Sequence, residues 1–261
     1  MSVAPATAPV IAVRDVSVRF GGIVALDGIG FEIREREILG LIGPNGAGKT
    51  TLFNCLSRLY TPSAGAIEFR GRDILGQPAH RIAGLGIGRT FQNVASFKKL
   101  SVRDNIRVGA HSASASDPLS DALRLPWVRR HERRTDRTTD DLIRWLRLGA
   151  VADLPVAGLP FGTQKRVELA RALATEPKLL LLDEPAGGLN HDEVEELGSL
   201  IRRIRDERGV TVLLVEHHMA LVMSVSDRVV VLNFGKKIAE GTPDEVQRNP
   251  DVIHAYLGEQ H

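Results

Sequence analysis

The sequence contains little cysteine: Cys55 is the only one among 261 residues. A single cysteine excludes an intrachain disulfide, and the lack of a disulfide framework favours a reducing compartment, the cytoplasm, over a secreted location. Lone cysteines mostly behave as small buried hydrophobes. We therefore assign no chemistry to Cys55.

Long apolar runs are also absent. No run approaches the roughly 18 to 20 apolar residues that span a bilayer, and runs such as Leu179–Leu182 suit buried strands. Residues 1–9 alternate small residues with prolines and lack a basic start followed by an apolar block, so we expect a flexible tail and not a signal peptide. Any role at a membrane is therefore expected to be peripheral.

Neither sign of charge dominates the sequence. Lys plus Arg number 34 and Asp plus Glu number 32, which gives a formal net charge of +2. This excess is too small to argue for nucleic acid, and no nucleic acid partner is expected. One stretch, Arg129–Arg137, holds five arginines with two acids and a histidine. It fits a solvated helix face, with contact to anionic lipid headgroups as the alternative.

What the chain does contain is apolar sequence, 43% of the residues, which is enough for the core of a single α/β domain. Apolar and polar residues alternate in stretches that predict an antiparallel sheet: Ile11–Phe20, Leu26–Ile33 and Ala66–Arg70. Continuous apolar runs predict a parallel sheet covered on both faces: Ile38–Ile42, Leu179–Leu182, Val210–Val215 and Val229–Leu232. Residues 102–158 hold little strand-like sequence, and the spacing of Leu142, Ile143 and Leu146 predicts a helical insertion.

The most specific motif is Gly43–Thr50, which reads Gly-Pro-Asn-Gly-Ala-Gly-Lys-Thr. It follows an apolar run and precedes the helix-like stretch Thr51–Leu59, the strand-loop-helix context of a P-loop. Backbone N–H groups of such a loop converge on a β-phosphate, the helix offers its positive end, and the lysine neutralises β/γ charge. A glycine-rich turn without a ligand is the alternative. The expected contacts to a nucleoside triphosphate come from Gly43, Pro44, Asn45, Gly46, Ala47, Gly48, Lys49, Thr50 and Thr51, with the Thr50 hydroxyl placed to ligate magnesium.

Polar residues follow two of the predicted parallel strands. Leu179–Leu182 ends in Asp183-Glu184-Pro185, and Val210–Val215 ends in Glu216-His217-His218. Ligands bind at this edge of open α/β sheets. Asp183 suits a role in holding magnesium, and Glu184 could polarise the attacking water as general base. These acids could instead merely cap a following helix, but the P-loop upstream favours catalysis.

Further motifs follow in a fixed order. Arg89-Thr90-Phe91-Gln92 is similar to a Q-loop, Leu159–Arg166 occupies the position of an LSGGQ signature motif, and Ala186–Asn190 resembles a D-loop. Together with the P-loop and the two acids, they resemble the ATP-binding-cassette (ABC) family over nearly the whole chain. The resemblance implies that Gln92 contacts magnesium and the attacking water, that His217 is the switch histidine, and that Phe20 stacks on adenine.

The resemblance also implies a fold and a mode of action. The expected fold is the α/β P-loop nucleotide-binding domain of the ABC family over residues 10–261, with a RecA-like parallel-sheet core, an antiparallel β-subdomain and a helical subdomain inserted at about residues 94–176. The ligands that the resemblance implies are ATP and Mg²⁺. In the family each ATP lies between the P-loop of one subunit and the signature motif of another, so the implied working unit is a dimer of ATPases docked on two membrane permeases.

The signature segment departs from the family pattern. It reads Leu159-Pro160-Phe161-Gly162-Thr163-Gln164 and precedes a helix expected at Val167–Thr175. Pro160 stands where serine is usual, which removes a hydroxyl and a backbone N–H, and Thr163 replaces the usual glutamine. Residues 160–164 are still expected to contact the ATP held by the opposite subunit, through Gly162, the Thr163 hydroxyl and the amides that open the helix. We expect weaker engagement as a result.

A finer resemblance concerns the transporter type. Arg19–Gly22, Arg89–Asn93, Ala186–Asn190 and the C-terminal Asn249–Glu259 are similar to the ATPases of branched-chain amino-acid importers. This implies a second, related ATPase, two permeases, indirectly a periplasmic substrate-binding protein, and a peripheral location at the cytoplasmic face of the inner membrane. Urea or amide importers and a lipopolysaccharide exporter carry similar subunits and stay open as alternatives.

Two other classes of function share parts of these motifs. Non-transport cassette proteins usually place two cassettes in one chain or insert a long coiled coil, and neither pattern occurs in this sequence. Small-molecule kinases share the P-loop but lack a signature helix. The order of Gln92, Gly162 and His217 argues against a kinase, and a transport motor is the function that the sequence favours.

Overall fold

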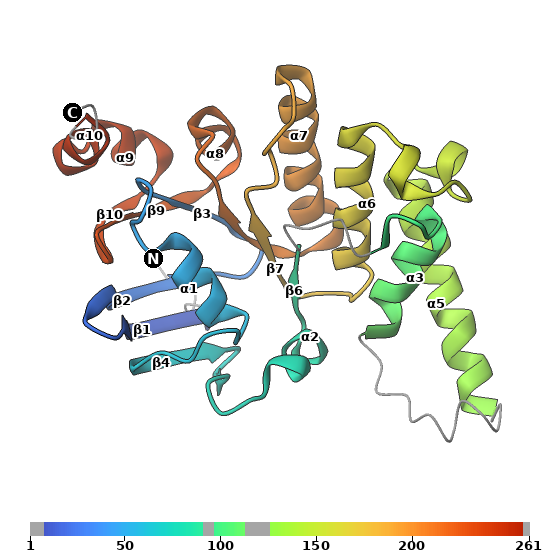
Figure 1. The fold of residues 1–261 in the computed structure, drawn as a ribbon, viewed down its shortest axis with the longest axis horizontal. Helices are drawn as coiled ribbons and strands as arrows, with labels where there is room; N and C mark the ends of the chain where they lie inside the picture. The colour runs from blue at the N-terminus through green and yellow to red at the C-terminus, as the bar shows by residue number, and fades with distance from the viewer. Residues whose placement is uncertain (1–7, 91–96, 113–125, 258–261) are drawn as a thin grey trace, which may run out of the picture. The chain divides into compact units, whose positions relative to one another are not determined.

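The computed structural model describes residues 8–90, 97–112 and 126–257 (Figure 1). The chain forms two compact units, one from Met1–Ile82 with Lys178–His261 and one from Ala83–Pro177. Gln92 lies outside the described residues, and so does most of the tail expected at residues 1–9. Neither expectation is tested by the structure.

A largely parallel sheet forms the centre of the first unit. Its strands lie in the order β10-β9-β3-β8-β7, where β9, β3, β8 and β7 are parallel and β10 is antiparallel to β9. The strands are β3 (Ile38–Ile42), β7 (Leu179–Asp183), β8 (Thr211–Val215), β9 (Arg228–Asn233) and β10 (Lys236–Gly241). Every residue of β3, β7 and β8 is buried, so the prediction from the continuous apolar runs is confirmed. Strand β10 was not predicted because its polar sequence Lys-Lys-Ile-Ala-Glu-Gly carries no such run.

Helices cover both faces of this sheet. In Figure 1, α7 and α8 lie along one side of the parallel strands and α1 along the other. The helices of this unit are α1 (Lys49–Leu56), α7 (His191–Arg208), α8 (Met219–Val225), α9 (Pro243–Arg248) and α10 (Pro250–Leu257), with a 3₁₀ turn η1 (Ala79–Arg81). A capping box between Asn190 and Glu193 precedes helix α7, and Gly209, whose φ is 64°, caps its end; both are standard helix boundaries.

An antiparallel sheet completes the first unit. Its strands lie in the order β2-β1-β4-β5, and they are β1 (Ile11–Phe20), β2 (Ile23–Ile33), β4 (Ala64–Phe69) and β5 (Arg72–Asp73). The alternating stretches therefore predicted this sheet correctly, although β2 begins three residues earlier than expected because its hairpin with β1 is tight, with Phe20 paired to Ile23. Buried residues of β1 and β2, such as Val16 and Ile29, face the core.

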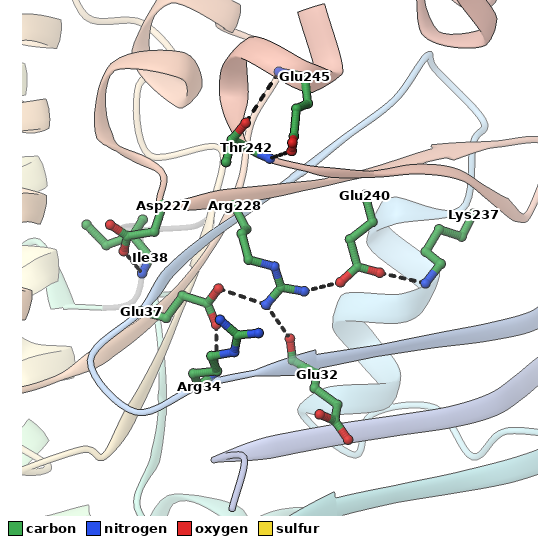
Figure 2. Close-up of polar contacts among 10 residues, drawn as sticks. All are labelled: Glu32, Arg34, Glu37, Ile38, Asp227, Arg228, Lys237, Glu240, Thr242 and Glu245. Atoms are coloured by element: carbon green, nitrogen blue, oxygen red, sulfur yellow. Dashed lines mark hydrogen bonds and ion pairs between the residues drawn. The ribbon is translucent and has the colours of Figure 1, made fainter. Parts of the chain in front are cut away.

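An ion-pair network joins the turn before β3 to β9 and β10 (Figure 2). The Arg228 guanidinium donates to Glu37 Oε1 at 2.8 Å and also contacts Glu240, which in turn pairs with Lys237 at 2.6 Å. The other Glu37 oxygen accepts from the backbone N–H of Arg34 at 2.6 Å. Glu37 is only 6% exposed, and its paired charge satisfies the requirement for a buried carboxylate. The network lies at the amino ends of β3 and β9.

The second unit is mainly helical. It contains β6 (Ile87–Arg89), α3 (Val102–Ser112), α5 (Pro126–Trp145), α6 (Phe161–Leu173) and the 3₁₀ turns η3 (Gly149–Val151) and η4 (Val156–Gly158); α2 (Ile82–Leu85) begins at the last residue of the first unit. Helices α3, α5 and α6 pack on one another. Gly109 permits a close approach of α3 to α6, since a Cβ there would lie 2.2 Å from the Arg171 carbonyl oxygen.

The basic stretch of the sequence lies on α5. Described arginines of this stretch, Arg130, Arg133, Arg134 and Arg137, are exposed, whereas Thr135 is buried. Arg134 pairs with Glu176 at 2.5 Å. The stretch is therefore a solvated helix face, as the sequence analysis favours. Among the helices that the structure describes, none is both long enough and apolar enough to cross a bilayer.

Candidate functional site

The register of the parallel strands brings the predicted phosphate loop, acids and histidine to one edge of the sheet. Leu41 of β3 is level with Val215 of β8, which is level with Asp183 of β7. The residues that follow these positions therefore leave the sheet side by side at its carboxyl edge, the usual ligand-binding edge of such sheets. The backbone N–H of Glu184 donates to the Val215 carbonyl at 2.8 Å and extends the pairing one residue further.

The phosphate loop depends on glycine at positions where a side chain would collide. Gly43 has φ 151°, and a Cβ there would lie 2.1 Å from the Leu232 carbonyl oxygen. Gly48, the N-cap of α1, has φ 102°, and its Cβ would lie 2.8 Å from the Ala25 carbonyl oxygen. Other residues rarely adopt these dihedrals. The loop therefore packs closely between the end of β9 and strand β2.

A turn that the sequence analysis did not single out supports the same loop. The backbone N–H of Gly235, between β9 and β10, donates to the Ala47 carbonyl at 3.0 Å, and the Gly235 carbonyl accepts from the N–H of Asp27 at 2.8 Å. Phe234 beside it has φ 44° and is 84% exposed. The stretch Asn233-Phe234-Gly235 directly after an apolar run contains a glycine turn signal that could have predicted this support.

Lys49 lies along the loop that precedes it. Its Nζ donates to the carbonyl oxygens of Gly43 at 2.5 Å and Pro44 at 2.8 Å, and the residue is 8% exposed. Helix α1 begins at Lys49, two residues before the predicted start, and ends at Leu56 instead of Leu59. Thr50 and Thr51 therefore lie in its first turn, where the helix dipole favours anions, and Thr50 is exposed.

The structure brings Glu184 and His217 together, as the sequence predicts. Glu184 Oε1 lies 3.8 Å from His217 Nδ1, and the two side chains are 37% and 63% exposed. Asp183, the last residue of β7, is 6% exposed. Glu184 has φ 44°, a left-handed conformation that is uncommon for residues other than glycine.

The sequence analysis noted Glu216 but assigned it no role. Its side chain is fully buried, and its Oε1 accepts from the N–H of Ala186 at 2.7 Å. Its Oε2 accepts from the N–H groups of His217 at 3.0 Å and His218 at 3.1 Å. The signal that could have identified it is an acid directly after a continuous apolar strand, the signal that identified Asp183.

Phe20, the predicted adenine contact, ends β1 and is 49% exposed. Its ring meets the ring of Tyr60 edge to face, with centroids 5.3 Å apart and planes at 74°. Tyr60 is 40% exposed and was not predicted as part of the site. Two aromatic rings in this arrangement form an apolar corner that suits a planar heterocycle.

The signature segment differs from the expectation in where its helix begins. Helix α6 starts at Phe161, six residues before the predicted Val167. Pro160 has the extended conformation of an N-cap. Its carbonyl accepts the first helical hydrogen bond, from the Gln164 N–H at 3.0 Å. The predicted contacts Phe161, Gly162, Thr163 and Gln164 thus form the first helical turn. Gln164 turns back, and its Nε2 donates to the Leu159 carbonyl at 2.8 Å.

Charged residues lie on the next turns of α6. Lys165 Nζ is 5.6 Å from the centre of the Phe161 ring and 3.6 Å from Glu168. Burial raises the pKa of the Glu168 carboxyl, and the positive charges of Lys165 and Arg171 oppose that rise. Burial also lowers the pKa of Arg171, against the attraction of Glu168. The helix therefore carries its charges in partly desolvated pairs.

Comparison with known proteins agrees with this arrangement. Residues 26–187 match the ABC transporter family, and residues 236–261 match the branched-chain amino acid ATP-binding cassette transporter family. The chain is 44% identical to BraF, a high-affinity branched-chain amino acid transport ATP-binding protein of Pseudomonas aeruginosa, over 96% of this chain and 98% of BraF. It is 43% identical to LivG of Escherichia coli strain K12, a protein with the same description, over 96% of this chain and 98% of LivG.

Solved structures lead to the same family. A nucleotide-free ATP-binding cassette from an ABC transporter superposes with a TM-score of 0.84 at 27% identity, covering 97% of this chain and all of that one. An ATP-binding cassette in its ADP conformation gives a TM-score of 0.85 at 28% identity with the same coverage. The chain therefore belongs to the ABC transporter family, as an ATP-binding and ATP-hydrolysing protein of the branched-chain amino acid type.

Proposed function

We propose that the residues at the carboxyl edge of the parallel sheet hold and hydrolyse ATP, with Glu184 as the general base. The observation that carries the proposal is the shared register of β3, β8 and β7, which places the phosphate loop, Glu184 and His217 at one edge. Lys49 neutralises charge on the β- and γ-phosphates, while the loop amides and the start of α1 bind the phosphate oxygens. Glu184 accepts the proton of the attacking water, and His217 at 3.8 Å orients this carboxylate.

Mg²⁺ fits the same edge. It prefers hard oxygen ligands and is usually bound through one or two protein carboxylates, together with phosphates and water. Thr50 offers an exposed hydroxyl in the first turn of α1, and Asp183 offers a carboxylate at the end of β7. The ion would neutralise negative charge that develops on the phosphates during hydrolysis. Gln92, proposed as its third protein contact and a contact of the water, lies outside the described residues.

Adenine is proposed to bind at Phe20. The half-exposed ring offers an apolar surface, and its edge-to-face partner Tyr60 limits how the Phe20 ring can turn. This contact would orient the base without contributing to the chemistry. Replacement of Phe20 should therefore raise the KM for ATP more than it lowers kcat.

The first turn of α6 is proposed to complete an ATP site held by a second cassette. Its N–H groups at Phe161, Gly162 and Thr163 precede the first described helical hydrogen bond, in which the Gln164 N–H donates to the Pro160 carbonyl, and the helix dipole favours phosphate there. The side chain of Phe161 is 45% exposed. The working unit would then be a dimer of cassettes.

The proposed domain boundaries, a cassette over residues 10–261 with its helical part at about 94–176, are supported by the separate unit Ala83–Pro177.

The transported substrate is proposed to be a branched-chain amino acid. The support comes from the named relatives and from the match of residues 236–261. The proposed partners are a second ATPase, two permeases and, indirectly, a periplasmic binding protein, with this chain at the cytoplasmic face of the inner membrane. Purification of the tagged chain from detergent-solubilised membranes should recover two multi-span proteins and a second cassette. Recovery of soluble proteins alone would contradict the transport role.

The catalytic assignment is tested by Glu184→Gln, which keeps the shape of the side chain and removes its basicity. The variant should bind Mg-ATP as the unaltered protein does and hydrolyse it at least ~100-fold more slowly, the usual contribution of a general base. Glu207→Gln, an exposed change on α7, is the control and should leave the rate unaltered. Addition of EDTA should stop hydrolysis in the unaltered protein. Full turnover by Glu184→Gln would exclude Glu184 as the base.

A further inference from the structure

We propose that Glu216 is a positioning residue that holds the general base and the switch histidine in one arrangement. It is fully buried, and its carboxylate accepts three backbone N–H groups from two segments, one after β7 and one after β8. The inference rests on the proposed roles of Glu184 and His217 and goes beyond them, since Glu216 itself faces neither solvent nor substrate.

The two oxygens of Glu216 bind different segments, one that follows Glu184 and one that contains His217. Oε1 binds the N–H of Ala186, two residues after Glu184, and Oε2 binds the N–H groups of His217 and His218. Glu184 itself donates its N–H to Val215, the residue before Glu216. The segment that carries Glu184 is thus tied to the end of β8 at two points, one through the backbone and one through the Glu216 side chain.

This second tie helps to hold Glu184 in a backbone conformation that it would not adopt unaided. Its φ of 44° places it in the left-handed region, which is unfavourable for a residue other than glycine and persists only where the surroundings enforce it. The bond from Ala186 restrains the next peptides, and the turn closes with the Gly187 N–H donating to the Glu184 carbonyl at 3.2 Å. The 3.8 Å separation of Glu184 and His217 depends on both segments keeping these positions.

A carboxylate suits this role better than a neutral side chain. Its two oxygens accept all three N–H groups with charge-assisted hydrogen bonds, which are stronger than neutral ones. A glutamine in its place has a single oxygen, so its NH₂ group must face either the Ala186 N–H or the pair at His217 and His218. One of the two segments then loses its bond inside a buried site, and the general base and the histidine are no longer held together.

The expected consequence is a loss of turnover without a loss of nucleotide binding. Lys49 and the phosphate loop are held by their own contacts with Gly43, Pro44 and Gly235, none of which involves Glu216. A small misplacement of a reacting group can cost on the order of 100-fold in rate. Glu216→Gln should therefore lower kcat about 10- to 100-fold while the affinity for ATP stays within about twofold, since affinity depends on groups that the change leaves in place.

The matched control is Glu37→Gln. Glu37 is also buried, at 6% exposed, and also accepts a backbone N–H, but it lies at the opposite end of β3 in the Arg228 network of Figure 2. Both variants neutralise a buried carboxylate and should lower the thermal midpoint. Only Glu216→Gln should lower kcat. Equal loss of kcat in both variants would mean that Glu216 acts through stability alone and would overturn the proposal.

The experiment uses the full chain in the complex with which it purifies, with steady-state ATPase kinetics, fluorescent-nucleotide affinity and thermal unfolding for each variant. Should Glu216→Gln give no folded protein, Glu216→Asp keeps the charge, cannot reach both segments, and should show the same loss of kcat. An unaltered kcat, or a fall in ATP affinity parallel to kcat, would overturn the inference. If instead Glu184→Gln retains full turnover, it is the proposed function that fails, because that variant does not depend on Glu216.

Discussion

The starts of α1 and α6 are both proposed to bind phosphate, yet they are built in opposite ways. The loop before α1 is fixed by glycines in conformations closed to other residues, by the Gly235 turn, and by Lys49 bonded to the loop carbonyls. The start of α6 has one extended residue, Pro160, with no side-chain cap, and then a half-exposed phenylalanine. The loop before α1 is a preformed set of hydrogen-bond donors, here called a preformed cage, whereas the start of α6 offers only the N–H groups of its first turn.

This difference indicates what each start can do by itself. A preformed set of donors loses little entropy when a ligand arrives, so α1 can bind nucleotide within one chain. The start of α6 has few groups of its own, because proline supplies neither a hydroxyl nor an N–H. It therefore suits a contact that forms only when a partner cassette brings the phosphate to it. Substitutions at the two starts should accordingly affect different measurements.

The largest effect is expected for Gly43→Ala. Its Cβ would lie 2.1 Å from the Leu232 carbonyl oxygen at φ 151°, so the loop or β9 must shift, at a cost of about 3 to 5 kcal/mol from overlap and strain. Chemical denaturation and fluorescent-nucleotide titration should show lost stability and lost ATP binding together. Gly46→Ala is the control, since nothing lies within 4 Å of its Cβ, and it should cost only about 1 kcal/mol from its φ. Equal effects of the two would contradict the preformed cage.

A smaller and opposite effect is expected for Pro160→Ser. The change restores a hydroxyl and an N–H at the N-cap, and one added charge-assisted hydrogen bond to phosphate is worth about 1.5 to 3 kcal/mol. ATP-dependent dimerisation, measured by sedimentation in the Glu184→Gln background, should therefore tighten, while ATP binding to the single chain stays unaltered. Pro160→Ala restores the N–H without the hydroxyl and separates the two contributions. An unchanged dimer constant would show that α6 does not engage the phosphate.

A further test of the rigid start of α1 uses Cys55, which lies buried on α1 behind the phosphate loop. Burial raises the pKa of this thiol from 9.0 to about 11, against a weaker opposing effect of Arg58. Because the thiolate is the reactive form, reaction with a disulfide reagent at pH 8 should be about 100-fold slower than in urea from ionisation alone. If native and unfolded chains react at the same rate, α1 opens readily and its loop is not a rigid cage.

Much of the site could be predicted from short segments of sequence. The phosphate loop, Asp183 and Glu184 each follow a continuous apolar run, and this pattern reports a parallel strand and the residue at its end without reference to distant sequence. The start of α6 was misplaced by six residues because a proline reads as a helix stop, although its fixed φ also suits the residue that opens a helix. Strand β10 was missed because an exposed edge strand needs no apolar pattern.

The sequence alone determined the family and its nucleotide, and it predicts which residues surround the phosphates, because a P-loop is recognised from local features: its glycines, one lysine and one helix start. Only the tertiary structure decided that Glu216 joins the segment after Glu184 to His217, that Gly235 supports the loop, and that Tyr60 meets Phe20. These contacts join residues 30 or more positions apart. They depend on strand register and turn geometry, which no local pattern encodes.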